Sequence, residues 1–291
     1  MLSILIPTFN DNIAPLVQPL CHELEQLTVP VEIIVGDDCS TQLDPKASLV
    51  NLEQVRIFRN PENLGRTATR HLLAEKATFD ILLFLDADVV PADSRFIQNY
   101  LSVINSAPVV YGGIRYAKES PEKSMRLRWV YGTEREAKPA RVRQQNPHFV
   151  ISPNLMIQRD LFLSLNASHI QRYGWDNVFS FQLFQKSIEV RHIDNPVIHL
   201  GLDNSKQYLS KVQKAMETLA WAEKNEMISH DFTSIQKFFN TVQAYGMAGL
   251  LGLFIRPWLP LMRWHLESKF PTVRALDLYK FYYFSKYKHT L

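Results

Sequence analysis

The chain has 291 residues, of which 46% are hydrophobic and 21% charged, a composition that is typical of a globular protein and excludes a disordered one. The formal net charge of +3 is too small to indicate nucleic-acid binding. Two cysteines, Cys21 and Cys39, cannot build a disulfide framework or a metal cluster, and they fit a reducing compartment. The first residues lack a basic segment and a long apolar run, so we interpret them as a strand rather than a signal peptide and expect a cytoplasmic protein.

Short apolar runs alternate with helical patterns over the first hundred residues, which predicts βαβ units and a mostly parallel sheet. Ile81 to Leu85 are five consecutive apolar residues, typical of a strand that is buried on both faces. Polar residues follow three of the expected strands, and ligands bind at the carboxyl edge of such sheets. We expect strands at 3–6 (ended by Pro7), 31–35, 55–58 and 81–85, and helices at 16–27 and 67–76.

After residue 91 the pattern is less regular. The stretch 117–148 is rich in Lys, Arg and Glu, and we interpret it as a surface excursion of helix and loop. Its arginines form a flexible lid, meet an anionic acceptor, or lie on a solvated helix face, and the last is the interpretation that its glutamates favour. We expect helices at 96–104, 159–165 and 179–186, strands at 109–116, 190–193 and 197–200, and helices over most of the remainder.

A carboxylate pair, Asp86 and Asp88, follows the 81–85 strand directly. Burying an unpaired carboxylate is costly, so a cation is expected beside these side chains. Two acids one residue apart can hold a hard divalent cation through oxygen, and that cation can hold a diphosphate. The triplet alone is weak evidence, because unrelated strand ends also produce it.

Four motifs, in this order and spacing, resemble the GT-A-fold glycosyltransferases of family 2, the large inverting group that uses nucleotide sugars. They are Ile4–Asn10 (ILIPTFN), Gly36–Ser40 (GDDCS), Asn63–Arg66 (NLGR) and Phe84–Asp88 (FLDAD). The resemblance covers about residues 1–205 and is most specific in the first 100. It implies an α/β, Rossmann-like GT-A domain over 1–205, with a nucleotide-sugar half at 1–100 and an acceptor half at 101–205. Residues 206–291 would form a helical C-terminal appendage.

The resemblance assigns the nucleoside to the first two motifs. The turn formed by Pro7, Thr8 and Asn10 would present backbone groups to the nucleoside, and a plain strand-ending turn is the alternative. Asp38 would accept a hydrogen bond from the imide N–H of uracil, while its neighbour Asp37 braces the loop. The alternative for this pair is an acidic turn closed by a serine.

The same resemblance assigns the diphosphate and a metal to the other motifs and to one histidine. Arg66, at the start of a helix, would contact phosphate, with Arg70 as a fallback that is better explained as structural. Asp88 would bind Mn²⁺ or Mg²⁺, and Asp86 would contact the ribose, or the metal through water. His199 would join Asp88 on the metal or meet the diphosphate, and a structural histidine is the alternative.

The acceptor side depends on Tyr173-Gly174-Trp175-Asp176-Asn177, where many family members carry Gly-Trp-Glu-Asp or a close variant. Asp176 stands where Glu is usual, and Asn177 stands where the usual base Asp is found. An amide cannot act as a base, so either Asp176 takes the role, or the alignment slips by one, or the protein is slow or inactive. Trp175 could stack on a sugar or pack in the core. We also include Asn154 among the acceptor-binding residues, because it falls where the family places small polar residues near the donor sugar.

The C-terminal region lies outside the resemblance. Its apolar stretch 244–262 is interrupted by Arg256, Pro257 and Pro260, although a spanning helix needs about 20 apolar residues without such breaks. Gly246, Gly249 and Gly252 form a small face suited to close helix packing. Basic and aromatic residues interleave from Arg256 onward, including Trp258, Trp264, Tyr279, Tyr282, Tyr283 and Tyr287. Docking on an anionic membrane, packing on the catalytic domain or a second copy, and a true span remain alternatives.

We therefore predict an inverting glycosyltransferase for polysaccharide biosynthesis. It would transfer a sugar from a metal-bound nucleoside diphosphate sugar, with UDP expected, to a hydroxyl of a glycan or lipid-linked acceptor. Peripheral membrane contact and a homodimer are further expectations. A catalytically weakened nucleotide-sugar-binding or scaffold protein is the alternative raised by Asn177. A nucleotidyltransferase ranks below both, because Pro7 to Asn10 replace the Gly-rich basic loop expected after its first strand.

Overall fold

The structure is a computed structural model that describes residues 1–42, 54–166, 170 and 172–290. The described chain divides into two compact units. The first unit comprises Met1–Ala117, Ala137–Gln171 and Lys186–Gly201, and the second comprises Lys118–Glu136, Arg172–Gln185 and Leu202–Leu291. Two short segments, Lys118–Glu136 and Arg172–Gln185, thus group with the C-terminal helices.

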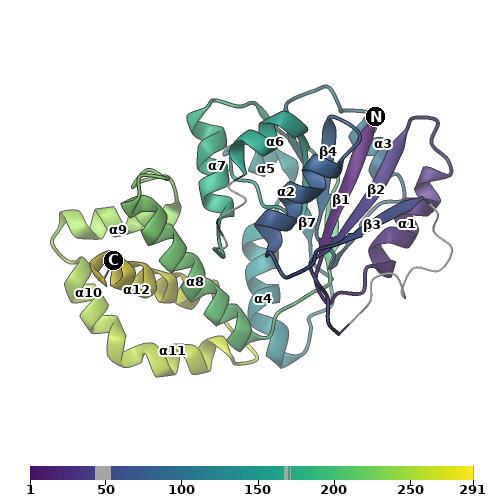
Figure 1. Cartoon of the computed structure of the whole chain (residues 1–291). Helices are drawn as coiled ribbons and strands as arrows, with labels where there is room; N and C mark the ends of the chain where they lie inside the picture. The colour runs from purple at the N-terminus through teal and green to yellow at the C-terminus, as the bar shows by residue number, and fades with distance from the viewer. Residues whose placement is uncertain (43–53, 167–169, 171, 291) are drawn as a thin grey trace. The chain divides into compact units, whose positions relative to one another are not determined.

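A seven-stranded, mostly parallel sheet forms the centre of the first unit (Figure 1). Its strand order is β3-β2-β1-β4-β8-β6-β9, and β8 runs antiparallel to both of its neighbours. The strands are β1 (Leu2–Thr8), β2 (Val31–Asp37), β3 (Val55–Arg59), β4 (Ile81–Leu85), β6 (Val109–Tyr111), β8 (Asn154–Gln158) and β9 (Val190–His192). All seven residues of β1 are buried, as expected for a central strand covered on both faces.

Helices cover this sheet in two packed pairs. Helix α2 (Arg66–Lys76) packs on β1 and β2 and against α6 (Arg159–Leu165). Helix α1 (Ala14–Leu24) packs against α3 (Phe96–Leu101), and its buried stripe of Leu16, Val17 and Leu20 has helical spacing. The short helix α5 (Ala140–Arg143) lies beside β9. The predicted mostly parallel α/β fold is confirmed.

Strand β1 continues through Pro7 to Thr8, so the prediction that Pro7 ends the strand was wrong. The pairing of β1 with β4 ends at Leu5, whereas its pairing with β2 extends to Thr8. At position 7 the strand therefore has one neighbour only, and a residue without an N–H group is tolerated there.

A second, three-stranded sheet has the order β5-β10-β7 and comprises β5 (Val89–Pro91), β10 (Val197–His199) and β7 (Ile114–Arg115). The single strand expected at 109–116 is in fact two strands in different sheets, because the chain changes direction at Gly112-Gly113. The pairing of β10 with β5 places His199 opposite Val89, one residue from Asp88.

The second unit is helical. It comprises α4 (Arg126–Tyr131), α7 (Asp176–Gln185), α8 (Ser205–Lys224), α9 (Ser234–Ala244), α10 (Ala248–Ile255), α11 (Leu259–Leu266) and α12 (Val273–Thr290). In Figure 1, α9, α10 and α11 surround α12, and α12 packs on α8. Tyr279, Phe281 and Phe284 of α12 are completely buried and form the core of this unit.

The aromatic residues of the C-terminal region fall into two groups. Tyr279 and Tyr283 are buried within the unit, whereas Trp258 and Trp264 are exposed. Within the described residues, no single helix is long and apolar enough to cross a membrane. The segments Ser234–Ala244 and Ala248–Leu266 meet that length and composition only as a pair, which is bent by 110°.

Candidate functional site

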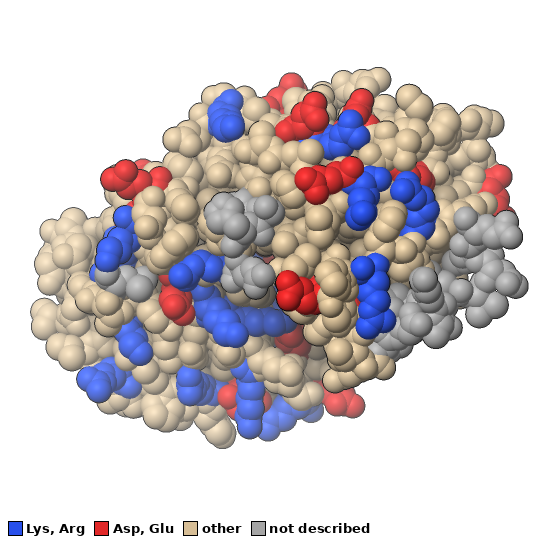
Figure 2. All heavy atoms as spheres, in the orientation of Figure 1, with Lys and Arg blue, Asp and Glu red and all other residues tan. Residues whose placement is uncertain are grey.

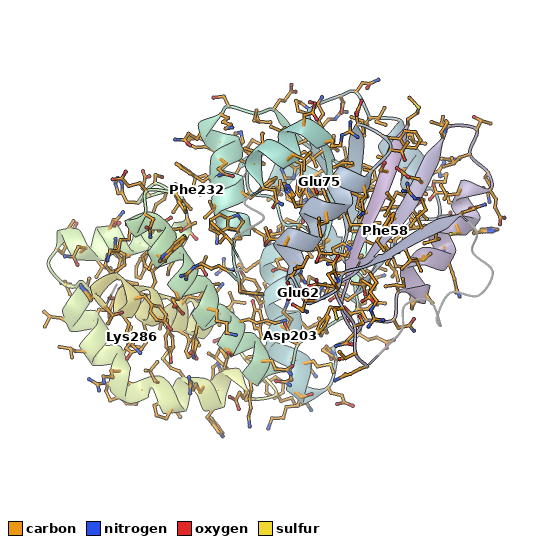
Figure 3. The ribbon with its side chains drawn as sticks, in the orientation of Figure 1. Phe58, Glu62, Glu75, Asp203, Phe232 and Lys286 are labelled. Carbon is orange, nitrogen blue, oxygen red and sulfur yellow. The ribbon has the colours of Figure 1, made fainter. Side chains whose placement is uncertain are left out.

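The carboxyl ends of β1, β2 and β4 bring the predicted donor motifs to one edge of the sheet. Because the three strands are parallel, with Thr8 opposite Asp37 and Leu5 opposite Phe84, the loops that follow them meet. Glu62, labelled in Figure 3, lies in the loop between β3 and α2 at this same edge. The sequence therefore placed these motifs together correctly.

Two residues with positive φ shape the turn at the first two motifs, Asn10 (φ 58°) and Cys39 (φ 64°). The Asn10 carboxamide oxygen accepts hydrogen bonds from the amides of Thr41 and Gln42, both at 2.8 Å. In return, the hydroxyl of Ser40 accepts a hydrogen bond from the Asn10 amide at 2.8 Å. The side chain of Asn10 thus fixes the loop, which leaves the backbone of the turn for the predicted nucleoside contact.

Thr8 is buried at the end of β1, and its carbonyl accepts a hydrogen bond from the Asp38 amide at 2.8 Å. Its hydroxyl is also buried, and it has no hydrogen-bond partner among the described residues. A buried hydroxyl without a partner calls for an explanation, and a bound ligand is one.

Asp38 connects the second motif to the third. One carboxylate oxygen accepts hydrogen bonds from the Leu64 amide at 2.8 Å and the Asn60 carboxamide at 2.9 Å, and the other accepts one from the Gly65 amide at 2.8 Å. Asp38 therefore braces the loops, in addition to Asp37, which accepts a hydrogen bond from the Ser40 amide. A carboxylate has about four acceptor positions, so one is left for a base, and the uracil contact stays a prediction.

Asp86 is buried and binds two arginines of α2. Its carboxylate forms a close ion pair with Arg70, and it lies 3.5 Å from the guanidinium of Arg66. Burial raises the pKa of Asp86, but the charges of Arg66, Arg70 and His199 lower it by a larger amount. The net result is a pKa below the ordinary value. The structural interpretation of Arg70 agrees with this geometry. The ribose contact of Asp86 stays a prediction.

Arg66 is the first residue of α2, and its side chain is 59% exposed despite the contact with Asp86. No side chain caps this end of the helix in the described structure, where the preceding residue is Gly65. An exposed guanidinium at the start of a helix, where the helix dipole is positive, attracts anions. This arrangement fits the predicted phosphate contact.

Asp88 and His199 form the second pair at this edge. The Asp88 carboxylate lies 3.4 Å from Nε2 of His199, and the Leu200 amide donates a hydrogen bond to the Asp88 carbonyl at 2.8 Å. The side chains are 28% and 10% exposed, and the ring of Tyr116 lies 5.6 Å from the imidazole. The pairing of β5 with β10 thus brings together two residues that are more than a hundred positions apart.

Gly201 lies against this pair, and its role was not predicted from the sequence. A Cβ at this position would lie 2.7 Å from Cβ and 2.8 Å from Cγ of Asp88, closer than real contacts allow. The available signal was the position of Gly201 two residues after His199.

The carboxylate oxygen of Asp88 and Nε2 of His199 could both be ligands of one divalent ion. Adjacent oxygen and nitrogen ligands of an octahedral ion lie about 3.0 Å apart, so the observed 3.4 Å needs a small shift of Asp88 or His199. Among the described residues, no third His, Cys, Asp or Glu completes a metal-binding group. Other ligands would therefore come from a diphosphate or water, as is common for Mg²⁺.

The assignment of Asn154 to the acceptor side was wrong. The residue is fully buried, and its carboxamide donates hydrogen bonds to the carbonyls of Gly113 and Asn195 at 2.8 and 2.9 Å. Its oxygen accepts a hydrogen bond from the Tyr100 hydroxyl at 2.7 Å. Asn154 therefore ties β8 to α3 and to the loops that follow β6 and β9, and its polar atoms are used in these contacts.

The other residues predicted for the acceptor side, in the segment 173–177, belong to the second unit. Gly174 has a φ of 88°, and a Cβ there would lie 2.9 Å from Cβ of Ala215 on α8, so only glycine fits this turn. Trp175 is buried, which agrees with core packing, yet its indole N–H has no hydrogen-bond partner among the described residues. Asp176 is the first residue of α7 and is half-buried.

The basic stretch 117–148 contains short helices joined by loops, and its arginines make specific contacts. In the second unit, Arg128 pairs with Glu136 at 3.0 Å and Arg135 with Asp277 at 2.6 Å. In the first unit, Arg143 is largely buried and donates to the Ile193 carbonyl at 2.7 Å. These contacts are structural and do not support a lid.

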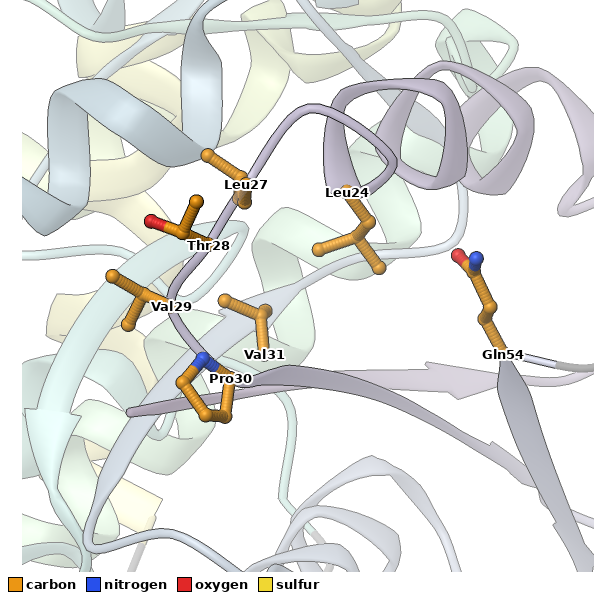
Figure 4. Close-up of a pocket in the computed structure, with 7 residues that line it drawn as sticks. All are labelled: Leu24, Leu27, Thr28, Val29, Pro30, Val31 and Gln54. Carbon is orange, nitrogen blue, oxygen red and sulfur yellow. The ribbon is translucent and has the colours of Figure 1, made fainter.

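A pocket lies at the opposite edge of the sheet, beside the amino ends of β2 and β3 (Figure 4). It is lined by Leu24, Leu27, Thr28, Val29, Pro30, Val31 and Gln54. These side chains are neutral and none can titrate near pH 7, so the pocket lacks the chemistry of the donor edge.

Several known proteins resemble this chain in sequence or in fold. The chain is 31% identical over 113 residues to an uncharacterized glycosyltransferase of Haemophilus influenzae, and the match spans 35% of this chain and 44% of the relative. Among solved structures, mannosyltransferase PcManGT from Pyrobaculum calidifontis, in complex with GDP-Man and Mn²⁺, matches with a TM-score of 0.59 at 14% identity. This match covers 96% of this chain and 85% of that one, and it shows a shared fold.

TarS from S. aureus, residues 1–349, is also similar, with a TM-score of 0.49 and 15% identity over 99% of this chain and 90% of that one. The profile described as glycosyl transferase family 2 matches residues 3–165, more than half of the chain and all four donor motifs. The protein therefore belongs to glycosyl transferase family 2.

Proposed function

We propose that the protein transfers a sugar, with inversion, from a metal-bound nucleoside diphosphate sugar to a hydroxyl of a glycan or lipid-linked acceptor. UDP is the nucleotide expected. The observation that carries this proposal is the pair of Asp88 and His199, 3.4 Å apart at the same sheet edge as the nucleotide motifs. Asp88 and His199 would hold the Mn²⁺ or Mg²⁺ ion, and the ion supplies positive charge to the leaving diphosphate when bound.

Neighbouring residues divide the remaining donor contacts. Arg66 contributes an exposed cation at the start of α2, and Asp86 holds that guanidinium in place. Because the pKa of Asp86 is low, its carboxylate stays charged and keeps the two arginines of α2 paired. The turn after β1 and the remaining acceptor position of Asp38 receive the nucleoside.

Asp176 is the proposed general base. A carboxylate at the start of a helix is stabilised in its charged form, and that form can accept the proton of an acceptor hydroxyl. The buried indole N–H of Trp175 would donate a hydrogen bond to an acceptor oxygen. Asn177 cannot take this role, since an amide has no basic lone pair at neutral pH.

Calorimetric titration tests the donor part of the proposal. UDP, GDP and TDP are each titrated with and without Mn²⁺, and GDP is included because PcManGT was solved with GDP-Man and Mn²⁺. We expect UDP to bind tightly only with the metal, and Asp88→Asn to lose this dependence. Asp160→Asn, an exposed acid of α6, is the matched control. If no nucleotide binds, or if Asp88→Asn binds as the wild type does, the proposed donor site is wrong.

A second experiment separates the enzyme from the alternative of a weakened nucleotide-sugar-binding protein, which Asn177 raises. Transfer and donor hydrolysis are measured for the wild type and for Asp176→Asn. We expect the variant to lose transfer while it keeps the donor affinity. Full transfer in Asp176→Asn would place the base elsewhere, and tight donor binding without turnover in the wild type would favour the binding protein.

A further inference from the structure

An apolar surface lies on the outer face of α10 and α11. It consists of six side chains, each more than half exposed: Leu250, Leu253, Phe254, Trp258, Leu261 and Trp264. Leu253 and Phe254 are adjacent, and the other intervals are three or four residues. This spacing continues through a short 3-10 turn between the helices, so the side chains form one stripe. Single exposed apolar residues are ordinary, but a contiguous stripe of this size indicates a binding surface.

The opposite face of the same helices is already buried. Ala248, Ile255 and Leu266 point into the second unit, where α10 and α11 pack on α12. The glycines, in contrast, do not mediate close packing as the sequence suggested. A Cβ at Gly249 would meet no atom within 4 Å. These helices are therefore apolar on both faces, and only the inner face is covered by the described part of the chain.

The charge of this region identifies the partner. Residues 232–266 contain no Asp or Glu, whereas Lys237, Arg256 and Arg263 lie within them. Arg256 is exposed in the turn between the two helices. In Figure 2, the end of the molecule that α10 occupies in Figure 1 is mostly tan and has Lys and Arg beside it. An anionic partner with an apolar interior matches this combination.

We propose that the outer face of α10 and α11 docks on an anionic lipid bilayer. The leucines and the phenylalanine of the stripe would lie among the acyl chains, its two tryptophans at the level of the head groups, and Arg256 against lipid phosphates. A second copy of the chain fits less well. A two-fold interface would place the same surface against itself, and this surface has basic residues but no acid to pair with them. The inference is independent of the donor and acceptor chemistry.

Vesicle co-sedimentation of the full chain tests this surface. Phosphatidylcholine vesicles are compared with vesicles that also contain phosphatidylglycerol. The variant Leu250→Ser/Phe254→Ser/Trp264→Ser removes three exposed side chains without opening a cavity. The matched control, Val29→Ser/Val142→Ser, changes two exposed apolar side chains of the first unit. We expect the triple variant to bind anionic vesicles roughly 100-fold more weakly or worse, and the control to bind as the wild type does.

The charge of Arg256 is tested by itself. Arg256→Gln should weaken binding about fivefold on anionic vesicles and leave binding to neutral vesicles unchanged. Arg95→Gln, at an exposed position of the first unit, should change neither. The proposal is overturned if the wild type does not bind anionic vesicles, or if the triple variant binds them equally well. It is also overturned if sedimentation velocity shows a dimer that the triple variant abolishes while vesicle binding is absent.

Discussion

Replacing Gly201 with alanine should disrupt the metal site without altering any proposed ligand. The new Cβ would lie 2.7 Å from Cβ and 2.8 Å from Cγ of Asp88, and closer still to Oδ2. Unbonded carbon atoms pack at about 3.5–4.0 Å, so Asp88 would have to move by about 1 Å. Because Oδ2 is the atom 3.4 Å from Nε2 of His199, this movement would separate the two side chains.

The size of the effect follows from this displacement. Metal sites tolerate ligand shifts of about 0.2 Å, and a disturbed supporting shell typically lowers metal affinity about 10- to 100-fold. We expect Gly201→Ala to weaken Mn²⁺-dependent UDP binding by about that factor. The overpacked side chain should also lower the free energy of unfolding by about 1–3 kcal/mol.

Calorimetry of UDP with Mn²⁺, at a temperature where the variant is folded, measures the loss. Gly249→Ala is the matched control, because a Cβ at this position meets no atom within 4 Å and α10 is helical there. The control should bind UDP as the wild type does, with stability unchanged or about 0.5–1 kcal/mol higher. If Gly201→Ala binds UDP with the wild-type affinity and metal dependence, Asp88 does not hold the ion in the geometry inferred.

Burial lowers the pKa of His192 to about 4, so stability should be complete above about pH 6.5 and decrease by up to about 3 kcal/mol as the pH falls to 4. Urea unfolding of the wild type and His192→Gln over this range measures the effect, and parallel pH profiles would contradict it. Asp38→Ala removes the acceptor for two backbone amides at 64–65. It should lower the free energy of unfolding by about 2–4 kcal/mol, measured with urea at pH 7. A loss below about 1 kcal/mol would contradict the bracing role. The pKa of Asp86 is lowered from 3.8 by Arg66 and Arg70 despite burial, so its contribution is present above that pH and is lost in stronger acid. Asp86→Asn should accordingly show a shallower acid limb in thermal unfolding, and an unchanged limb would be inconsistent with the ion pairs.

Elements with strong local patterns were predicted well. The strand Ile81–Leu85 and the helix Arg159–Leu165 have the predicted bounds, because an unbroken apolar run and a helical period each suffice to define them. Strands β5 and β8 were not predicted. Residues Asn154–Gln158 are a strand because β4 and β6 pair with them on both sides, and that pairing is a long-range property.

The site shows the same division between local and long-range information. Asp86 and Asp88 are identical residues two positions apart, and nothing in the motif distinguishes their partners. The structure gives Asp86 to the arginines of α2 and Asp88 to His199, through strand pairing across more than a hundred residues. The prediction for Asn154 was wrong for a related reason, since it came from the family's local placement of polar residues, whereas its buried partners lie far away in the sequence, on helix α3 and in the loop between β9 and β10.

The position of Cys39, partly exposed in the nucleoside turn, makes the protein convenient for site-selective labelling. The chain has two cysteines, and burial raises the pKa of Cys21 to about 11, with the nearby Glu25 adding to the effect. A thiol reagent near neutral pH should therefore react with partly exposed Cys39 and spare Cys21. A fluorophore attached there would sit between Asp38 and Ser40, so its emission would report directly on whether the turn is occupied.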